Sequence, residues 1–283
     1  MILQANAKIN IGLRIIGKRA DGYHDLETFF YEIQWHDELE LKTSARLEMV
    51  SHSAEAPADD SNLCLRAARL LQEITGVTAG AFITLHKNIP IGAGLGGGSS
   101  DAAAVLRGLN SLWNLKLPND ELRAIAVKLG ADVAFFIEGG SAYATGRGEI
   151  LKHFPFTMPF WILVVAPPVH VATAWAYGNL KQKSGYAAKS LQTIVNEQIH
   201  NPKSFVLDVS NDFEPSVFEA FPIIQQTKIK LLSAGAQFAL MSGSGSSVFG
   251  LFETEAAAKH AAASFDAAFR SSLTPPNYLS RQQ

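Results

Sequence analysis

Cysteine is almost absent from this sequence: Cys64 is the only one among 283 residues. A single thiol cannot form an internal disulfide, and it argues against a metal centre built from cysteines. Proteins without disulfides are typical of reducing compartments, so we expect a cytoplasmic protein.

Clustered positive charge and long apolar runs are also missing. The net charge is −2 and no basic run has the pattern of a nucleic-acid surface, so we expect no nucleic-acid partner. The most apolar segment, residues 160–166, is followed by two prolines and is far shorter than the ~20 residues of a membrane helix. The N-terminus has no basic stretch followed by an apolar one, so we expect neither a signal peptide nor membrane association.

Apolar residues make up 47% of the chain, which is enough for a substantial core. Apolar and polar residues alternate from Ile9 to Ile15, and this period of two predicts a half-buried strand. Similar patterns predict strands at residues 26–35, 38–42, 46–50, 81–89, 160–166, 237–241 and 247–252. Helical patterns and capping signals predict helices at residues 63–75, 100–113, 119–129, 174–180, 186–199, 215–233 and 254–269.

The order of these elements bears on the fold class. Strands and helices do not alternate strictly, which favours an α+β fold over a doubly wound sheet. We place a boundary within residues 154–159, which divides the chain into two domains, 1–154 and 155–283.

Glycine and serine concentrate in one segment, residues 90–100, which reads PIGAGLGGGSS. A predicted strand enters this segment and a predicted helix leaves it, which leaves no slack for a disordered linker. Glycines allow backbone N–H groups to face an anion, and the dipole of the following helix adds to the attraction. The segment therefore favours a phosphate-binding loop, with a tight structural turn as the alternative.

Other known phosphate-binding motifs fit this loop less well. Residues 92–97 satisfy G-x-G-x-x-G, but residues 115–124 predict a loop entering a helix where a dinucleotide site needs a second strand with an acidic residue. The Gly-Lys-Ser/Thr triplet of a Walker A loop is absent, as are the His-Arg-Asp and Asp-Phe-Gly sequences of protein kinases.

Three segments in order along the chain carry a family resemblance. They are AKINIGLRIIGKRADGYHDLET at 7–28, PIGAGLGGGSSDAA at 90–103 and MSGSGSSVFG at 241–250. They closely resemble the three motifs of the GHMP small-molecule kinases, and the DGYH and GGGSSDAA sequences are similar to the branch that serves the non-mevalonate isoprenoid pathway. Asn6 departs from the proline usual in the family, and residues 178–210 match no motif.

The resemblance implies a fold and a reaction. It implies a ribosomal-S5-like N-terminal domain and a ferredoxin-like C-terminal domain, with ATP and substrate meeting in the cleft between them. The implied reaction transfers the γ-phosphoryl group of ATP, with Mg²⁺, to the 2-hydroxyl of a methylerythritol moiety. The implied substrate is a small molecule that carries a cytidine diphosphate group, and we expect the enzyme to be a monomer or a weak homodimer.

Two residues are candidates for the chemistry. By pattern alone, Lys8 is either a solvated lysine or part of a site lined together with Asn10, and Asp132 is equally a helix cap or a base. The resemblance implies that Asp132 accepts the proton of the attacking hydroxyl. It further implies that Lys8 keeps Asp132 ionised and stabilises the transferring phosphoryl group, while Asn10 contacts the substrate.

The resemblance also implies ligand contacts. It places Tyr23 and His24 on the cytosine and Thr173 and Tyr177 on the other wall of that site, whereas by pattern alone Thr173 caps a helix and Tyr23 packs within its turn. Two residues, Asn62 and Lys87, are expected near the adenine. The residues expected around the ATP phosphates are Pro90, Ile91, Gly92, Ala93, Gly94, Leu95, Gly96, Gly97, Gly98, Ser99 and Ser100, of which the two serines also suit a helix N-cap.

Two other functions stay open at this point. One is a different GHMP kinase, acting on a substrate such as homoserine or mevalonate, and the DGYH sequence and the triple glycine before Ser99 argue against it. The other is a ligand-sensing protein that keeps the fold without catalysis, and the presence of both Lys8 and Asp132 argues against it.

Overall fold

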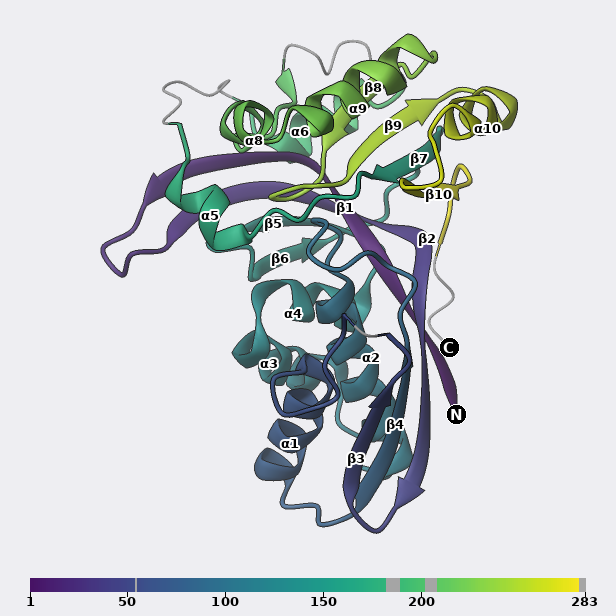
Figure 1. The fold of residues 1–283 in the computed structure, drawn as a ribbon. Helices are drawn as coiled ribbons and strands as arrows, with labels where there is room; N and C mark the ends of the chain where they lie inside the picture. Colours follow the sequence, from purple (N-terminus) through teal and green to yellow (C-terminus); the bar gives the residue numbers. More distant parts are fainter. Residues whose placement is uncertain (54, 182–188, 202–207, 280–283) are drawn as a thin grey trace.

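The computed structural model describes the chain except for residues 54, 182–188, 202–207 and 280–283 (Figure 1). It contains two sheets. The strands of the first are β1 (Ile2–Lys18), β2 (His24–Ser44), β3 (Leu47–Ser51), β4 (Gly80–His86), β5 (Ser141–Thr145) and β6 (Ile150–His153). The strands of the second are β7 (Trp161–Ala166), β8 (Phe238–Met241), β9 (Val248–Phe252) and β10 (Arg270–Thr274).

The first sheet is built around β2, which pairs antiparallel with β1 along most of its length and with β4 and β5 at its two ends. The strand order is β3-β4-β2-β5-β6, and β3 with β4 is a parallel pair. The two strands predicted at residues 26–35 and 38–42 are therefore one strand of 21 residues. The second sheet is antiparallel throughout, in the order β10-β7-β9-β8.

Helices cover the outer face of each sheet (Figure 1). Those on the first sheet are α1 (Leu63–Thr75), α2 (Gly97–Leu112), α3 (Asn119–Leu129) and α4 (Ala131–Glu138). The helices of the second half are α5 (Thr173–Gly178), α6 (Leu191–Gln198), α8 (Glu214–Ala220), α9 (Pro222–Ser233) and α10 (Glu255–Ala263). Of these, α9 and α10 pack on the second sheet, whereas the apolar residues of α6 enter the layer between the two sheets. The prediction of an α+β fold is confirmed, and among the described residues no helix is both long and apolar enough to cross a bilayer.

The inner faces of the two sheets share one apolar layer. Side chains alternate along β7, so that Ile162 and Val164 enter this layer while Leu163 and Val165 pack toward the outer helices. The layer contains Ala7, Ile9, Ile11, Phe29, Tyr31 and Ile33 from the first sheet and Ile162, Val164, Phe238, Leu240, Phe249 and Leu251 from the second. The molecule is thus arranged in the order helices, sheet, sheet, helices, and the division into domains 1–154 and 155–283 stays a prediction.

Several predicted element boundaries are wrong for identifiable reasons. The helix expected over 215–233 is two helices, because Pro222 cannot continue a helix and instead begins α9. The helix expected over 254–269 ends at Ala263, and a strand that we did not predict, β10, follows it. The helix expected over 186–199 is α6 at Leu191–Gln198, and the start that we predicted for it, residues 186–188, lies outside the described residues.

Candidate active site

A cavity of about 480 Å³, here called the central cavity, opens beside the glycine loop. Segments that are far apart in the sequence line it, from β1, from residues 90–99, from the start of α4 and from α5. The predicted site residues that line it are Lys8, Asn10, Asn62, Lys87, Pro90, Ile91, Gly92, Ala93, Gly94, Leu95, Gly96, Gly97, Gly98, Ser99, Asp132, Thr173 and Tyr177.

Backbone hydrogen bonds hold the glycine loop against the other two motif segments. The Lys8 N–H donates to the Leu95 carbonyl over 3.0 Å, and the Ser247 N–H donates to the Ala93 carbonyl over 3.0 Å. The Ser242 hydroxyl donates to the Gly94 carbonyl over 2.9 Å. Gly94 has φ +75°, and a Cβ there would overlap with the Ser242 carbonyl oxygen, so the close approach of these two segments requires glycine.

The loop leads directly into α2, which begins at Gly97 with Gly96 as its N-cap at φ +71°. We expected the helix to begin near Ser100, with Ser99 or Ser100 available as a cap. Both serines instead lie inside the first turn and no side chain caps the helix, which leaves its first N–H groups available to an anion. Ser99 lines the cavity, whereas Ser100 is buried and does not.

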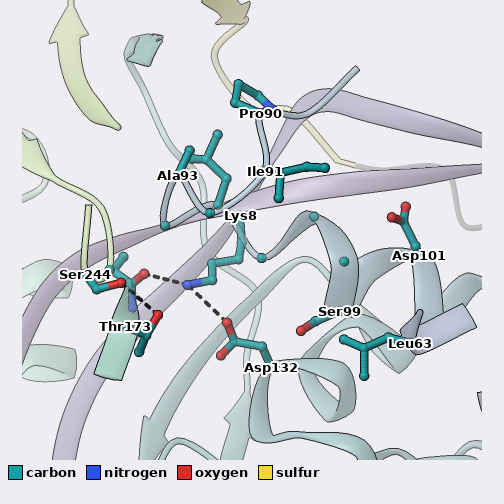
Figure 2. A pocket seen from close by; sticks show the side chains of 18 of the residues that line it. Lys8, Leu63, Pro90, Ile91, Ala93, Ser99, Asp101, Asp132, Thr173 and Ser244 are labelled. Carbon is teal, nitrogen blue, oxygen red and sulfur yellow. Dashed lines mark hydrogen bonds and ion pairs between the residues drawn. The ribbon is translucent and has the colours of Figure 1, made fainter. Parts of the chain in front are cut away.

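Lys8 and Asp132 form an ion pair in the central cavity, with 3.4 Å between Nζ and Oδ2 (Figure 2). The Lys8 side chain is 4% exposed and lies over the Phe30 ring at 4.8 Å, while Asp132 is 35% exposed. Asp132 sits in the first turn of α4, where no side chain makes a capping hydrogen bond. The capping alternative for Asp132 is therefore wrong, and its carboxylate is directed to Lys8.

Asn10 is held by contacts that orient its amide. Its Oδ1 accepts a hydrogen bond from Lys8 Nζ over 2.6 Å, and its Nδ2 donates to the Thr28 hydroxyl over 2.8 Å. The Thr28 hydroxyl in turn donates to the Gly12 carbonyl over 2.6 Å. We did not predict a role for Thr28, although a buried threonine within the apolar run of β2 was a usable signal.

The two residues expected near the adenine are engaged in structural contacts. Asn62 caps α1 by accepting a hydrogen bond from the Cys64 N–H over 2.8 Å. Lys87 forms ion pairs with Asp37 and with Asp101, the latter over 2.9 Å, in a cluster where all three side chains are at most 6% exposed. We did not predict either aspartate, since their meeting with Lys87 depends on how β2, β4 and α2 pack.

The charges of this cluster are unbalanced, with two carboxyl groups around one ammonium. Asp37 also accepts hydrogen bonds from the Asn88 and Ile89 N–H groups, over 2.5 and 2.8 Å. Asp101 Oδ1 has no hydrogen-bond partner among the described residues. Burial, opposed by Lys87 and assisted by Asp37, accordingly raises the pKa of Asp101.

A second cavity of about 770 Å³, here called the turn cavity, lies next to the central cavity. Tyr23 and His24 line it together with Tyr177, which lines both cavities. The His24 and Tyr177 rings stack with centroids 5.1 Å apart. Burial, assisted by the charge of Asp132, raises the pKa of Tyr177 to about 12, so its hydroxyl stays neutral at physiological pH.

Thr173 does not cap α5, as its pattern suggested. Ala172 is the N-cap, and Thr173 is the first residue of the helix. Its hydroxyl instead lies 3.1 Å from the Ser244 hydroxyl, which connects α5 to the turn between β8 and β9 (Figure 2). Thr173 and Ser244 form one wall of the central cavity beside Lys8.

Metal-ligating side chains are sparse in this site. Among the residues that the structure describes, no group of three His, Cys, Asp or Glu side chains has the arrangement of a metal centre. Magnesium at nucleotide sites is bound chiefly by substrate phosphates with one or two carboxylates, so a full protein cage is not required. The Asp132 carboxylate and the Ser99 hydroxyl, both on the central cavity, are oxygen donors that fit such an ion.

Comparison with known proteins identifies the family. Residues 62–140 match the GHMP kinases N terminal domain and residues 195–271 match the GHMP kinases C terminal domain. A protein of Pelodictyon phaeoclathratiforme named 4-diphosphocytidyl-2-C-methyl-D-erythritol kinase is 46% identical over 100% of this chain and 99% of its own length. The chain belongs to the GHMP kinases. As a member of that family it is a small-molecule kinase, and ATP is its phosphoryl donor.

Further similarities cover nearly the whole of this GHMP kinase. A protein of Prosthecochloris aestuarii with the same name is 47% identical over 98% of this chain and 97% of its own. A solved structure of 4-(cytidine 5'-diphospho)-2C-methyl-D-erythritol kinase superimposes with a TM-score of 0.83 at 34% identity, covering 98% of this chain and 100% of the other. The resemblance seen in the three sequence motifs is thus confirmed over the full chain.

Proposed function

We propose that this GHMP kinase transfers the γ-phosphoryl group of ATP to the 2-hydroxyl of 4-diphosphocytidyl-2-C-methyl-D-erythritol. Relatives that bear the name of this activity match the chain over nearly its full length. The observation that carries the proposal is the Lys8–Asp132 pair, which lies beside the glycine loop within one cavity. A carboxylate and a cation at this position supply what phosphoryl transfer to an alcohol requires.

Asp132 is the proposed general base. Its carboxylate is partly exposed to the central cavity, so it can accept the proton as the substrate hydroxyl attacks phosphorus. Lys8 faces that carboxylate, since its buried ammonium lies 3.4 Å away. One Lys8 proton is directed to Asn10 and one toward Asp132, and the third can bind an oxygen of the transferring group.

The glycine loop and the start of α2 are proposed to bind the ATP phosphates. Backbone N–H groups and the positive end of α2 supply the attraction, and the lack of side chains permits close approach. Ser99 adds a hydroxyl, which would hold Mg²⁺ together with the ATP phosphates. When bound, the ion neutralises phosphate charge. Asn62 and Lys87 line the same cavity and stay assigned to the adenine end.

The acceptor substrate is proposed to extend from the central cavity into the turn cavity. Asn10 would contact its hydroxyl-bearing end near Asp132, and so would Thr173, which lines the central cavity and not the turn cavity, in place of the cytosine contact that the sequence resemblance implied. Tyr23, His24 and Tyr177 would contact the cytosine, since all three line the turn cavity. We further propose a cytoplasmic monomer or weak homodimer, with domains 1–154 and 155–283 on either side of the cleft.

The direct test is to incubate the protein with ATP, Mg²⁺ and the cytidylyl substrate and to identify the product by mass. We expect one added phosphoryl group on the substrate and one ADP per turnover. Homoserine and mevalonate serve as competing acceptors in the same assay. Phosphorylation of either in preference to the cytidylyl substrate would contradict the proposal, and a lack of ADP release with every acceptor would favour a ligand-sensing role.

A further inference from the structure

Arg147 lies where the central cavity meets the turn cavity. Only two residues of the described chain, Arg147 and Tyr177, line both. Gly130 and Ala131 line the turn cavity and the next residue, Asp132, lines the central one, so the two spaces adjoin along this edge as well. A ligand that reaches from Asp132 to the stacked rings of His24 and Tyr177 crosses from one cavity into the other, and Arg147 lines both.

The backbone around Arg147 is fixed. It occupies the turn between β5 and β6, where Gly146 and Gly148 have φ of +68° and +104°. The Gly146 carbonyl accepts a hydrogen bond from the Leu26 N–H over 2.7 Å, and the Arg147 N–H donates to Glu149 Oε2 over 2.6 Å. The side chain therefore extends from a rigid turn that is attached to β2.

The Arg147 guanidinium keeps its donors available. It lies over the Tyr23 ring at 4.9 Å, and its Nε is 3.7 Å from Glu149 Oε1, which is too long for a hydrogen bond. The guanidinium donates no hydrogen bond to a described residue, and the side chain is 41% exposed. Lys8, by contrast, is already committed to Asn10 and Asp132.

We propose that Arg147 binds the diphosphate group of the acceptor substrate and so selects acceptors that carry a nucleoside diphosphate. This inference rests on the proposed function, because it assumes a hydroxyl at Asp132 and a base in the turn cavity. The diphosphate of such a substrate lies between these two ends and carries negative charge. A guanidinium presents paired N–H donors that match phosphate oxygens, and the contact with Tyr23 orients its plane.

Other charges at the junction set the specificity of this contact. Lys128 is a second cation on the turn cavity, while Glu149 and Asp132 are anions on the two sides of Arg147. Glu149 Oε2 already accepts a hydrogen bond from the backbone N–H of Arg147. A phosphate therefore competes with one carboxylate, which lies 3.7 Å from Arg147 Nε. The phosphate offers the guanidinium two acceptor oxygens, which Glu149 does not.

The test compares cytidine, CMP and CDP as ligands of the wild type, Arg147→Met and Arg147→Lys by titration calorimetry at low salt. We expect the wild type to bind CDP more tightly than cytidine by roughly 10- to 150-fold, the usual scale of charge-assisted hydrogen bonds. Arg147→Met should remove most of this preference and leave cytidine binding unchanged. Arg147→Lys should keep part of it, since the charge stays and the paired donors are lost.

Arg19→Met is the matched control, because Arg19 lies in the nearby turn after β1, pairs with Asp21 and Asp25, and lines neither cavity. It should leave the preference for CDP intact. An equal loss of cytidine and CDP binding in Arg147→Met would show that Arg147 only supports Tyr23, and no preference for CDP in the wild type would also overturn the inference. Turnover of the cytidylyl substrate by the wild type is measured separately, so failure of the proposed function is distinguished from failure of this contact.

Discussion

At the scale of single residues, the site depends on a buried cation whose partners are already in place. Lys8 is 4% exposed in a strand that is otherwise largely apolar, and burying an ammonium is costly unless it is paired. Asn10, Asp132 and the Phe30 ring provide that compensation. Asp132 therefore has two roles: it stabilises the Lys8 ammonium, and it is the proposed base.

Asp132→Asn separates these two roles. A general base contributes about 10²–10⁴-fold to the rate, so we expect kcat to fall by that order. Thermal stability should fall only modestly, because Lys8 keeps its contacts with Asn10 and Phe30 and an amide oxygen can still face it, and ATP affinity should change little. Steady-state kinetics and thermal unfolding check this, with the exposed Asp120→Asn as a control. Normal activity in Asp132→Asn would exclude Asp132 as the base.

Tyr177→Leu tests the assignment of the cytosine site. Stacking of a base on an aromatic ring contributes about 1–3 kcal/mol, which corresponds to a roughly 5- to 150-fold change in affinity. We expect KM for the cytidylyl substrate to rise within this range and KM for ATP to stay nearly constant. Trp175→Leu, on the same helix but outside both cavities, is the control. A rise in KM for ATP instead would mean that the two nucleotide sites are reversed.

At the scale of elements, two positions of the glycine loop exclude a side chain for different reasons. Gly96 has φ +71°, and a Cβ there would lie 2.9 Å from Phe136 and 3.2 Å from the Lys8 side chain. Gly98 lies within α2, where a Cβ would meet only Leu63 at 3.9 Å. The protein itself therefore tolerates a methyl group at Gly98, and only a ligand would exclude it.

Gly96→Ala and Gly98→Ala should consequently behave differently. Gly96→Ala should cost stability, by about 1–2 kcal/mol for the left-handed backbone alone, and should lower kcat through Lys8. Gly98→Ala should raise stability, by less than the roughly 0.5–1 kcal/mol typical of a helix interior because Gly98 lies in the first turn of α2, yet raise KM for ATP. Urea unfolding and ATP kinetics measure the two effects. An unchanged KM for ATP in Gly98→Ala would argue that phosphates do not approach α2.

The cluster of Lys87, Asp37 and Asp101 joins the residue that follows β4 to β2 and α2, so its protonation affects how these elements pack. Burial, opposed by Lys87 and assisted by Asp37, raises the pKa of Asp101 to about 8, whereas the carboxyl ionises near pH 4 in the unfolded chain. The folded state therefore retains a proton that the unfolded state has lost. The stability contributed by Asp101 is fully present below about pH 4 and declines as the pH rises toward about 8.

Asp101→Asn, a neutral substitution, should remove this dependence. We expect the unfolding free energy of the wild type, relative to Asp101→Asn, to decrease between about pH 4 and about pH 8. Urea unfolding at several pH values measures it. Asp37→Asn should destabilise at every pH, because Asp37 accepts the Asn88 and Ile89 N–H groups. A constant difference between the wild type and Asp101→Asn would show that Asp101 is ionised in the folded state.

At the scale of the whole molecule, the two sheets bury a common apolar layer, in addition to the core that the first half forms alone with its own helices. Ile9 and Phe29 from the first sheet pack in this layer with Ile162 and Phe249 from the second. The Ser242 and Ser247 contacts to the glycine loop cross the same boundary. The two halves are therefore coupled both in the core and at the site.

This coupling predicts one cooperative unfolding transition for the full chain. Calorimetric and van't Hoff enthalpies should agree in differential scanning calorimetry. Ile9→Ala should lower stability by about 2–5 kcal/mol, as expected for a large-to-small change in a core, and should shift the single transition without dividing it. Two separate transitions would show that the domains predicted at 1–154 and 155–283 unfold independently.

Local patterns in the sequence were sufficient for much of the fold and for the central chemistry. The strand β1, the helix α1 and the strand–glycine loop–helix arrangement depend on neighbouring residues, and each was predicted, although β1 is buried on both faces and not half-buried. The motifs that indicated a GHMP kinase are likewise contiguous. Pro222 was also a local signal for the end of a helix, but the prediction of one helix over 215–233 did not take it into account.

Packing between distant segments decided the rest. The polar residues of β10 form a strand only because β7 offers its edge, and Thr28 joins the site only because the pairing of β2 with β1 places it beside Asn10. Asp101 meets Lys87, which also pairs with Asp37 of β2, only after α2 packs on the sheet. Arg147 lies between two cavities that segments distant in the sequence line. Such contacts join residues far apart in the chain, and no pattern of adjacent residues specifies them, because their partners are set by how the sheets and helices pack.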